Sequence, residues 1–273
     1  MKKIALLLPI SLFIFSCSSS KQEVVTHTDQ CASLMQEATN ELAEGGTFRA
    51  KEILNGVLND CSGTGFMEDA QYMLAQAYFE DEEWVDSRAE FDLYADHYPN
   101  SPRTPNAIYK QALSSYHSPF KMGRDGALTK EGIEEFQEFL MNYPDHPKSD
   151  SARYFKQELL ERLATAEINK AQLYLNMKEP QAAAIYLKEF IKGYGFSKLY
   201  PRAHYMLMES YVRLDQFEQA RTFHTKLVHE FPEVAKESKA ISALEEINEA
   251  EKDFLSRIES EKEKKIRQRS KEL

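Results

Sequence analysis

The sequence predicts an all-α fold, a superhelical solenoid of about five helical hairpins followed by a long C-terminal helix. Apolar residues recur at helical spacing, proline or glycine ends the segments, and the pattern returns several times in one register. The segment from Phe66 to Pro99 is the clearest copy, because an acidic turn at residues 80–83 separates its two amphipathic halves. Such a hairpin cannot bury its apolar face alone, so it needs neighbours of the same kind.

A short Ala-x-Tyr step opens four of the predicted hairpins, at Ala70, Ala107, Ala152 and Ala203. Three hairpins also share one spacing between a tyrosine, a small residue and the proline or glycine that ends the hairpin. These triplets are Tyr78, Ser87 and Pro99; Tyr174, Ala183 and Gly195; and Tyr211, Ala220 and Pro232. The period and pattern match the tetratricopeptide repeat, a helix–turn–helix unit of about 34 residues. The alternative is an ordinary helical bundle.

The composition excludes several classes of function. The 273 residues are 42% hydrophobic and 29% charged, with a formal net charge of −10. An acidic surface disfavours nucleic acid, because phosphate binding needs clustered lysine and arginine. The sequence contains no HExxH motif and no phosphate-binding glycine loop, and its histidines are scattered. An enzyme needs acid–base residues that converge in a pocket, so we expect a non-catalytic protein without cofactor or metal.

Residues 1–16 combine a basic start with an apolar run too short for an ordinary transmembrane helix, which is typical of a signal peptide. The run ends in Ile-Phe-Ser-Cys17, which resembles the lipobox of bacterial lipoproteins, whose cysteine is acylated. We expect a lipid anchor at Cys17, a polar tether over residues 17–29 and a periplasm-facing location. In the usual sorting rule of such lipoproteins, a serine after the cysteine, here Ser18, permits transfer to the outer membrane. The alternative is a plain secretory signal with a chance cysteine.

The first hairpin, residues 30–61, has a cysteine at each open end. Cys31 starts its first helix and Cys61 ends its second. These points are adjacent in an antiparallel hairpin, and an oxidising periplasm permits a disulfide there. We expect a Cys31–Cys61 bond, with two buried free thiols as the alternative. Zinc is not expected, because two isolated cysteines lack the paired ligands of a structural site.

Three features depart from the plain repeat. An insertion at residues 117–126 contains Phe120 and precedes a helix expected from about Thr129. A helix over about residues 148–177 contains no glycine or proline, so it is expected to join front and rear repeats. The segment 233–273 carries an apolar stripe, including Leu244, Ile247 and Phe254, that should cap the last repeat. Its charged end is either a solvated helix or a tail that binds a partner or a membrane surface.

Longer motifs indicate a family. The stretches FMEDA at 66–70, YPNSP at 98–102 and YPDHP at 143–147 resemble the BamD family, the tetratricopeptide lipoproteins of outer-membrane β-barrel assembly. The resemblance covers Cys17 to about Pro232. The chain departs from the family where Tyr186-Leu187 replaces a common Asn-Arg and where Gly193-Tyr194-Gly195 replaces Tyr-Pro.

The resemblance implies a division of labour. Front repeats, residues 30–144, would receive unfolded outer-membrane proteins, and rear repeats, residues 145–232, would dock a POTRA domain of the barrel subunit BamA. Other Bam lipoproteins are further partners that the resemblance admits. First helices of hairpins line the concave face of such solenoids. The substrate-groove candidates are therefore Tyr72, Gln76, Phe79, Tyr109, Ser115 and the inserted Phe120, and the docking candidates are Glu209 and Arg213.

For the tyrosines among these candidates, packing between helices is the alternative to contact with a bound protein. Two other functions compete with assembly as a whole. One is a periplasmic repeat adaptor lipoprotein of peptidoglycan or Tol-type machinery. The other is an enzyme such as a helical peptidoglycan hydrolase, against which the absence of a recognisable catalytic motif counts.

Overall fold

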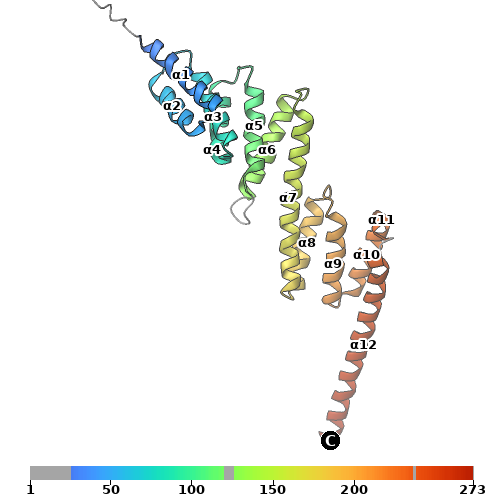
Figure 1. Ribbon diagram of the computed structural model, residues 1–273. Coiled ribbons are helices and arrows are strands. Elements are labelled where there is room, and N and C mark those ends of the chain that lie inside the picture. Colours follow the sequence, from blue (N-terminus) through green and yellow to red (C-terminus); the bar gives the residue numbers. More distant parts are fainter. Residues whose placement is uncertain (1–25, 120–125, 236–237, 273) are drawn as a thin grey trace, which may run out of the picture. The chain divides into compact units, whose positions relative to one another are not determined.

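The computed structural model describes residues 26–119, 126–235 and 238–272, and it describes the side chains of these residues except at 234–241 and 271–272 (Figure 1). Cys17 and Phe120 lie outside these residues, so the predicted lipid anchor and insertion contact stay predictions. Every regular element in the described ranges is a helix. The expected all-α, tetratricopeptide-like class is confirmed. No helix in the described part of the chain has the length and apolar character needed to cross a membrane.

The chain divides into two compact units, one ending at Ala70 and one beginning at Gln71. The first unit holds α1 (His27–Glu44) and α2 (Thr47–Asp60), which pack against each other. The α1 helix starts with a capping box, in which the Thr26 hydroxyl accepts from the Asp29 N–H and the Asp29 carboxylate accepts from the Thr26 N–H. This cap places the helix start before residue 30, so the end of the expected tether is helical.

Helix α3 (Met67–Glu80) begins in the first unit and continues into the second. The second unit is a row of helical hairpins. Its further helices are α4 (Trp84–His97), α5 (Thr104–His117), α6 (Gly126–Asn142), α7 (Ser149–Asn176), α8 (Pro180–Gly193), α9 (Tyr200–Arg213), α10 (Phe217–Glu230), α11 (Pro232–Ala235) and α12 (Ser238–Glu272). Helix α6 begins before Thr129, whose side chain is buried. The prediction that this helix starts near Thr129 is therefore wrong.

The turns inside the hairpins share one backbone conformation. Glu82, Lys178 and Asp215 each adopt a left-handed conformation, with φ of 59°, 61° and 57°. Each follows the repeat tyrosine by four residues, and the next N–H bonds back to that tyrosine's carbonyl. In the first hairpin the left-handed position is taken by Gly45, with φ of 82°. The shared register in the sequence is thus a shared turn geometry.

Small side chains let the paired helices approach, as the repeat pattern predicts. Ser87, Ala183 and Ala220 are completely buried, and so are the alanines of the Ala-x-Tyr steps. The tyrosine of that step is not always buried, because Tyr109 is buried whereas Tyr154 is exposed. Alanine is therefore the packing residue of the step.

Helix α7 belongs to two hydrophobic clusters. Its first half contributes Ala152 and Leu159 to a cluster with α5 and α6, including Phe136 and Phe139. Its second half contributes a separate set, including Leu175, to a cluster with α8, α9, α10 and α12. The front and rear cores of this unit are therefore divided within one continuous helix.

The start of α12 packs on α10. Ile247 is buried, and the ring of Phe254 lies 5.8 Å from that of Phe217. Leu244 is 39% exposed, while Ala243 is buried. The expected stripe is therefore wrong at Leu244, because helix rotation turns the smaller neighbouring residue inward. Residues 259–270 are exposed.

Candidate peptide-binding face and docking end

The first helices of successive hairpins touch one another, since α5 contacts α7 and α7 contacts α9. On α3, the aromatic residues Tyr72 and Phe79 are two helical turns apart and lie on one face of the helix. Tyr109 and Tyr116 have the same spacing on α5. Each is covered by a cation from the next hairpin. The four pairs, which we call the cation–aromatic ladder, are Arg103 over Tyr72 at 5.5 Å, Lys110 over Phe79 at 5.0 Å, Lys148 over Tyr109 at 5.8 Å and Arg162 over Tyr116 at 4.1 Å, each measured to the ring centroid.

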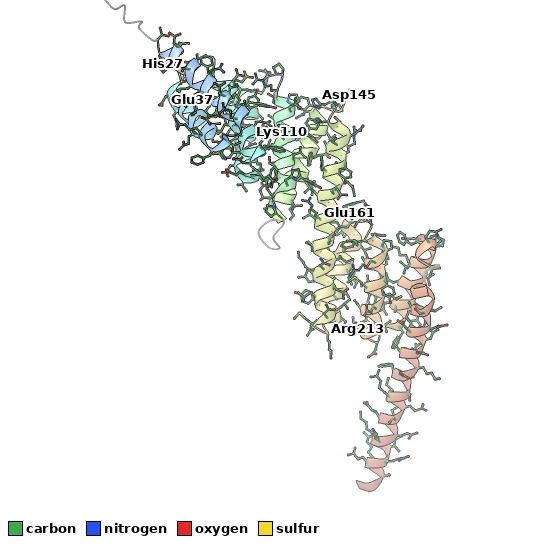
Figure 2. All side chains as sticks on the ribbon, in the orientation of Figure 1. His27, Glu37, Lys110, Asp145, Glu161 and Arg213 are labelled. Atoms are coloured by element: carbon green, nitrogen blue, oxygen red, sulfur yellow. A yellow bond between two sulfur atoms is a disulfide. The ribbon has the colours of Figure 1, made fainter. Side chains whose placement is uncertain are left out.

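Lys110 lies at the middle of the ladder, on α5 (Figure 2). Its ammonium donates to the Gln76 carboxamide oxygen and also lies 5.7 Å from the Phe91 ring centroid. Burial lowers the pKa of Lys110, Lys148 lowers it further, and Glu80 opposes the shift. The ladder therefore holds a positive charge in an apolar setting, where it can attract an acceptor group more strongly than in water.

The C-terminal end of α5 carries an aromatic cluster. The His117 ring stacks on Trp84 at 4.7 Å, and the Phe79 ring meets Trp84 edge-on at 5.2 Å. Burial lowers the pKa of His117, with Arg162 acting in the same direction. This cluster extends the apolar face of the ladder beyond Phe79.

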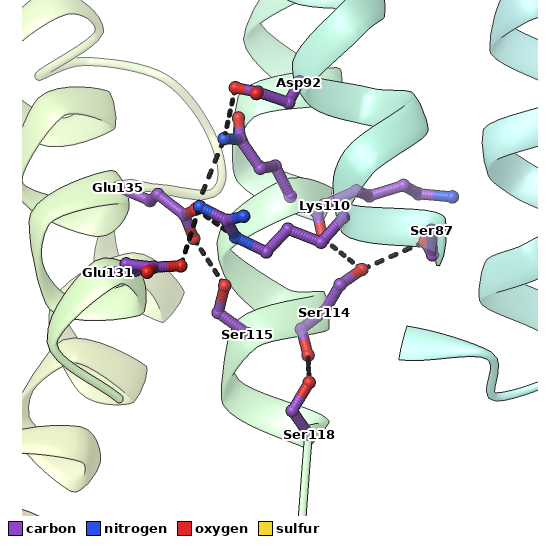
Figure 3. Close-up of polar contacts among 10 residues, drawn as sticks. Ser87, Asp92, Lys110, Ser114, Ser115, Ser118, Glu131 and Glu135 are labelled. Atoms are coloured by element: carbon purple, nitrogen blue, oxygen red, sulfur yellow. Dashed lines mark hydrogen bonds and ion pairs between the residues drawn. The ribbon is translucent and has the colours of Figure 1, made fainter. Parts of the chain in front are cut away.

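Two candidates on α5 serve packing. Tyr109 is 6% exposed and meets the rings of Phe136 and Phe139. Ser115 is 2% exposed, and its hydroxyl donates to the Glu135 carboxylate at 2.7 Å (Figure 3). Gly132 leaves so little room that a Cβ there would lie 2.9 Å from the Ser115 Cβ. Ser115 faces α6, so the expectation that it lines an open groove is corrected.

Glu135 is the centre of a polar network between α4, α5 and α6. Arg88 binds it at 2.7 Å and binds Glu131 at 3.1 Å. Gln111 donates to Glu135 at 3.3 Å and to Asp92 at 2.8 Å. Burial raises the pKa of Glu135, and the bonds from Ser115 and Arg88 partly oppose this shift. The network therefore aligns α5, which carries half of the ladder.

The two rear candidates are bonded to each other. Arg213 donates to the Glu209 carboxylate at 2.5 Å and to the Leu175 carbonyl at 2.9 Å, so it also ties α9 to the end of α7. Beside it lies an open polar hollow of about 750 Å³, lined by Val212, Arg213, Asp215, Ala250, Asp253, Ser256 and Arg257. This hollow, between the end of α9 and α12, is a concave surface at the rear of the second unit.

The cysteines of the first unit are bonded as the sequence predicts. The Cys31 and Cys61 sulfur atoms are 2.03 Å apart, and both residues are buried. His27 is a neighbour that the sequence reasoning missed. Its Nε2 atom lies 3.9 Å from the Cys31 sulfur and 3.0 Å from the Asp60 carbonyl oxygen. The signal was the spacing of His27 and Cys31, because residues four apart share a helix face.

The family model described as YfiO, outer membrane lipoprotein, matches residues 27–227. The chain belongs to this family. A relative from Rickettsia prowazekii, outer membrane protein assembly factor BamD, is 23% identical over 85% of this chain and 92% of its own length. The relative of that name from Vibrio cholerae is 25% identical over 76% of this chain and 89% of its own length. The match with the Caulobacter vibrioides factor is 22% identical over 59% of this chain, and it spans only 52% of that relative.

Solved tetratricopeptide structures also resemble the chain. The P58(IPK) TPR domain is 13% identical with a TM-score of 0.42, over 82% of this chain and 56% of that one. The TPR2AB domain of yeast Sti1 is 16% identical with a TM-score of 0.41, over 84% of this chain and 87% of that one.

The ladder cations were also missed by the sequence reasoning. Arg103 follows Tyr72 in the sequence by the same number of residues as Lys110 follows Phe79. The separation between Tyr109 and Lys148 is longer because it contains the insertion. That recurrence is a sequence signal for the first two pairs. It does not show which way each side chain points.

Proposed function

We propose that this family member is an outer-membrane-anchored, periplasm-facing assembly factor without catalytic activity. It would hold unfolded outer-membrane proteins on its front hairpins and dock the POTRA domain of a BamA-type barrel protein with its rear hairpins. Membership of the YfiO family and the assembly role named for its relatives support this function. The cation–aromatic ladder is the observation that carries the binding role.

The chemistry of the ladder suits an extended peptide. Tyr72, Phe79 and Tyr116 are only partly buried, so their rings offer apolar contacts to alternate side chains of a strand-like segment. The cations between the rings suit carbonyl oxygens or carboxylates of the same peptide. An outer-membrane strand that has not yet folded combines alternating apolar residues with unpaired backbone acceptors.

Photocrosslinking from single positions tests the front face. A photoreactive phenylalanine analogue at Gln76 or Phe79 should crosslink to newly secreted outer-membrane proteins in the native host. The control position is Met141 on α6, which is 65% exposed but lies on a second helix of a hairpin. Crosslinking from Met141 with equal yield, or from neither first-helix position, would exclude the ladder as the receiving face.

Co-purification tests the rear docking site. Extraction in mild detergent should recover a POTRA-bearing barrel protein in stoichiometric yield. Asp253→Lys, in the wall of the rear hollow, should reduce that yield, whereas Lys252→Glu, at the next exposed position of α12, should leave it unchanged. Recovery of peptidoglycan enzymes or Tol-type components without a barrel protein would instead support the envelope-adaptor function.

A further inference from the structure

We propose that reduction of the Cys31–Cys61 disulfide creates a zinc site in which His27 is the third protein ligand. Two isolated cysteines alone would not make a zinc site. The structure adds a histidine, and one ligand atom from each of the three residues lies within 4.8 Å of the others. Neither the family nor the assembly role assigns a metal to this hairpin, so the proposal is independent of both.

The backbone already holds the three residues close enough for their side chains to bind one metal ion. A tetrahedral Zn²⁺ site has Zn–S bonds of about 2.3 Å and Zn–N bonds of about 2.0–2.1 Å, which place a sulfur and a nitrogen roughly 3.6 Å apart. The Cys31 sulfur and His27 Nε2 are 3.9 Å apart. The Cα atoms of the two cysteines are 5.9 Å apart, so rotation of their side chains can separate the sulfurs to the roughly 3.8 Å of two zinc-bound thiolates.

Each ligand is fixed by a helix end. His27 and Cys31 lie one turn apart in α1, whose first turn is held by the Thr26 capping box. Cys61 is the C-cap of α2, and its N–H donates to the Val57 carbonyl at 2.9 Å. His27 is exposed whereas both cysteines are buried, so a metal could enter from the His27 side and keep a water as its fourth ligand.

A dithiol reductant can open the Cys31–Cys61 disulfide. Two electrons and two protons pass from the reductant to the disulfide, which yields two thiols, and the reductant becomes a disulfide. Zinc then displaces one proton from each thiol, and the site of one Zn²⁺ and two thiolates is electrically neutral. His27 must bind through the lone pair of Nε2, so its proton moves to Nδ1 and the contact with the Asp60 carbonyl is released.

Zinc titration of the mature chain carrying Cys17→Ser tests the site, because Cys31 and Cys61 are then its only thiols. The disulfide is reduced, the reductant is removed without air, and zinc is titrated against a coloured competing chelator. We expect one equivalent to bind the reduced protein and none to bind the oxidised protein. His27→Ala should weaken the affinity at least tenfold, whereas His97→Ala, at another exposed histidine near a helix end, should not change it.

Thermal melting supplies a second readout should reduction loosen the hairpin. Zinc should raise the melting temperature of the reduced protein but not that of the reduced His27→Ala variant. Reduced protein that binds no more zinc than a Cys31→Ser/Cys61→Ser variant would overturn the proposal. Binding that is equally tight in His27→Ala would also overturn it, because the site would then be a dithiolate without the histidine.

Discussion

Lys110 is the residue on which the proposed peptide-binding face depends most. It is the cation that contacts both a candidate ring, Phe79, and a candidate amide, Gln76. Because burial is the largest cause of its lowered pKa, the charged form is less stable in the folded protein than in water. A charge kept despite this cost is more easily explained by binding than by stability.

Replacement of Lys110 by methionine should therefore weaken binding without loss of stability. We expect Lys110→Met to raise the Kd of a labelled outer-membrane strand peptide at least fivefold, measured by fluorescence anisotropy. Lys188→Met is the matched control, because Lys188 covers the Tyr211 ring at 5.4 Å in the rear hairpins. Equal weakening by both variants would contradict the assigned face.

The stability difference between Lys110→Met and the wild type should depend on pH in a defined direction. A lysine whose folded-state pKa is lowered makes the unfolded state bind more protons, so wild-type stability rises with pH between the folded and ordinary pKa values. Lys110→Met lacks this dependence. Urea unfolding should show a variant at least as stable as wild type at neutral pH, with a relative advantage that shrinks as the pH rises toward the ordinary lysine pKa.

Ser115 shows where residue-scale inference fails. Its place on a first helix favours the groove, but its hydroxyl is bonded to the buried Glu135 of α6. A glutamate and a nearby Gly132 look like surface and turn residues in a sequence. Only the packing of α5 against α6 turns them into a polar contact and a close approach.

The hairpin turns are the elements that the sequence specifies most locally. Lys178 has φ of 61°, a conformation that costs a residue with a Cβ about 1–2 kcal/mol and a β-branched residue more. Lys178→Val should lower the free energy of unfolding by about 1–2 kcal/mol in chemical denaturation. Lys178→Gly should keep or slightly raise it, and the reverse order would contradict the turn geometry.

The terminal helix α12 divides into a packed part and an exposed part. Residues 259–270 are exposed, so deletion of residues 259–273 should change the melting temperature by less than about 2 °C. Phe254→Ala removes a ring that packs on Phe217 and should destabilise by about 1–3 kcal/mol. A large loss on deletion would mean that the exposed end also packs.

At the scale of the whole molecule, α7 decides whether the front and rear cores of the second unit unfold together. Thr165 is exposed, and its hydroxyl donates at 2.8 Å to the carbonyl of Glu161, which lies on α7 between Leu159 of the front cluster and Ala164 of the rear cluster. Thr165→Pro should remove a helical hydrogen bond and cost about 3 kcal/mol or more. Calorimetry should then resolve two transitions for this unit, whereas Thr165→Ala should keep one; an unsplit transition in both variants would contradict coupling through α7.

The sequence by itself determined the local features of each hairpin. Helical periodicity, proline and glycine stops, the turn register and the Cys31–Cys61 pair depend on neighbours along the chain or on two ends of one hairpin. Short-range geometry sets all of them, so residue type and spacing suffice.

The tertiary structure alone decided which side chains of packed helices meet, both across one hairpin and between hairpins. It placed Lys110 over Phe79, turned Ser115 toward α6 and divided two cores within α7. These contacts depend on helix crossing angles and side-chain directions. Small rotations of a helix change them without changing its sequence pattern.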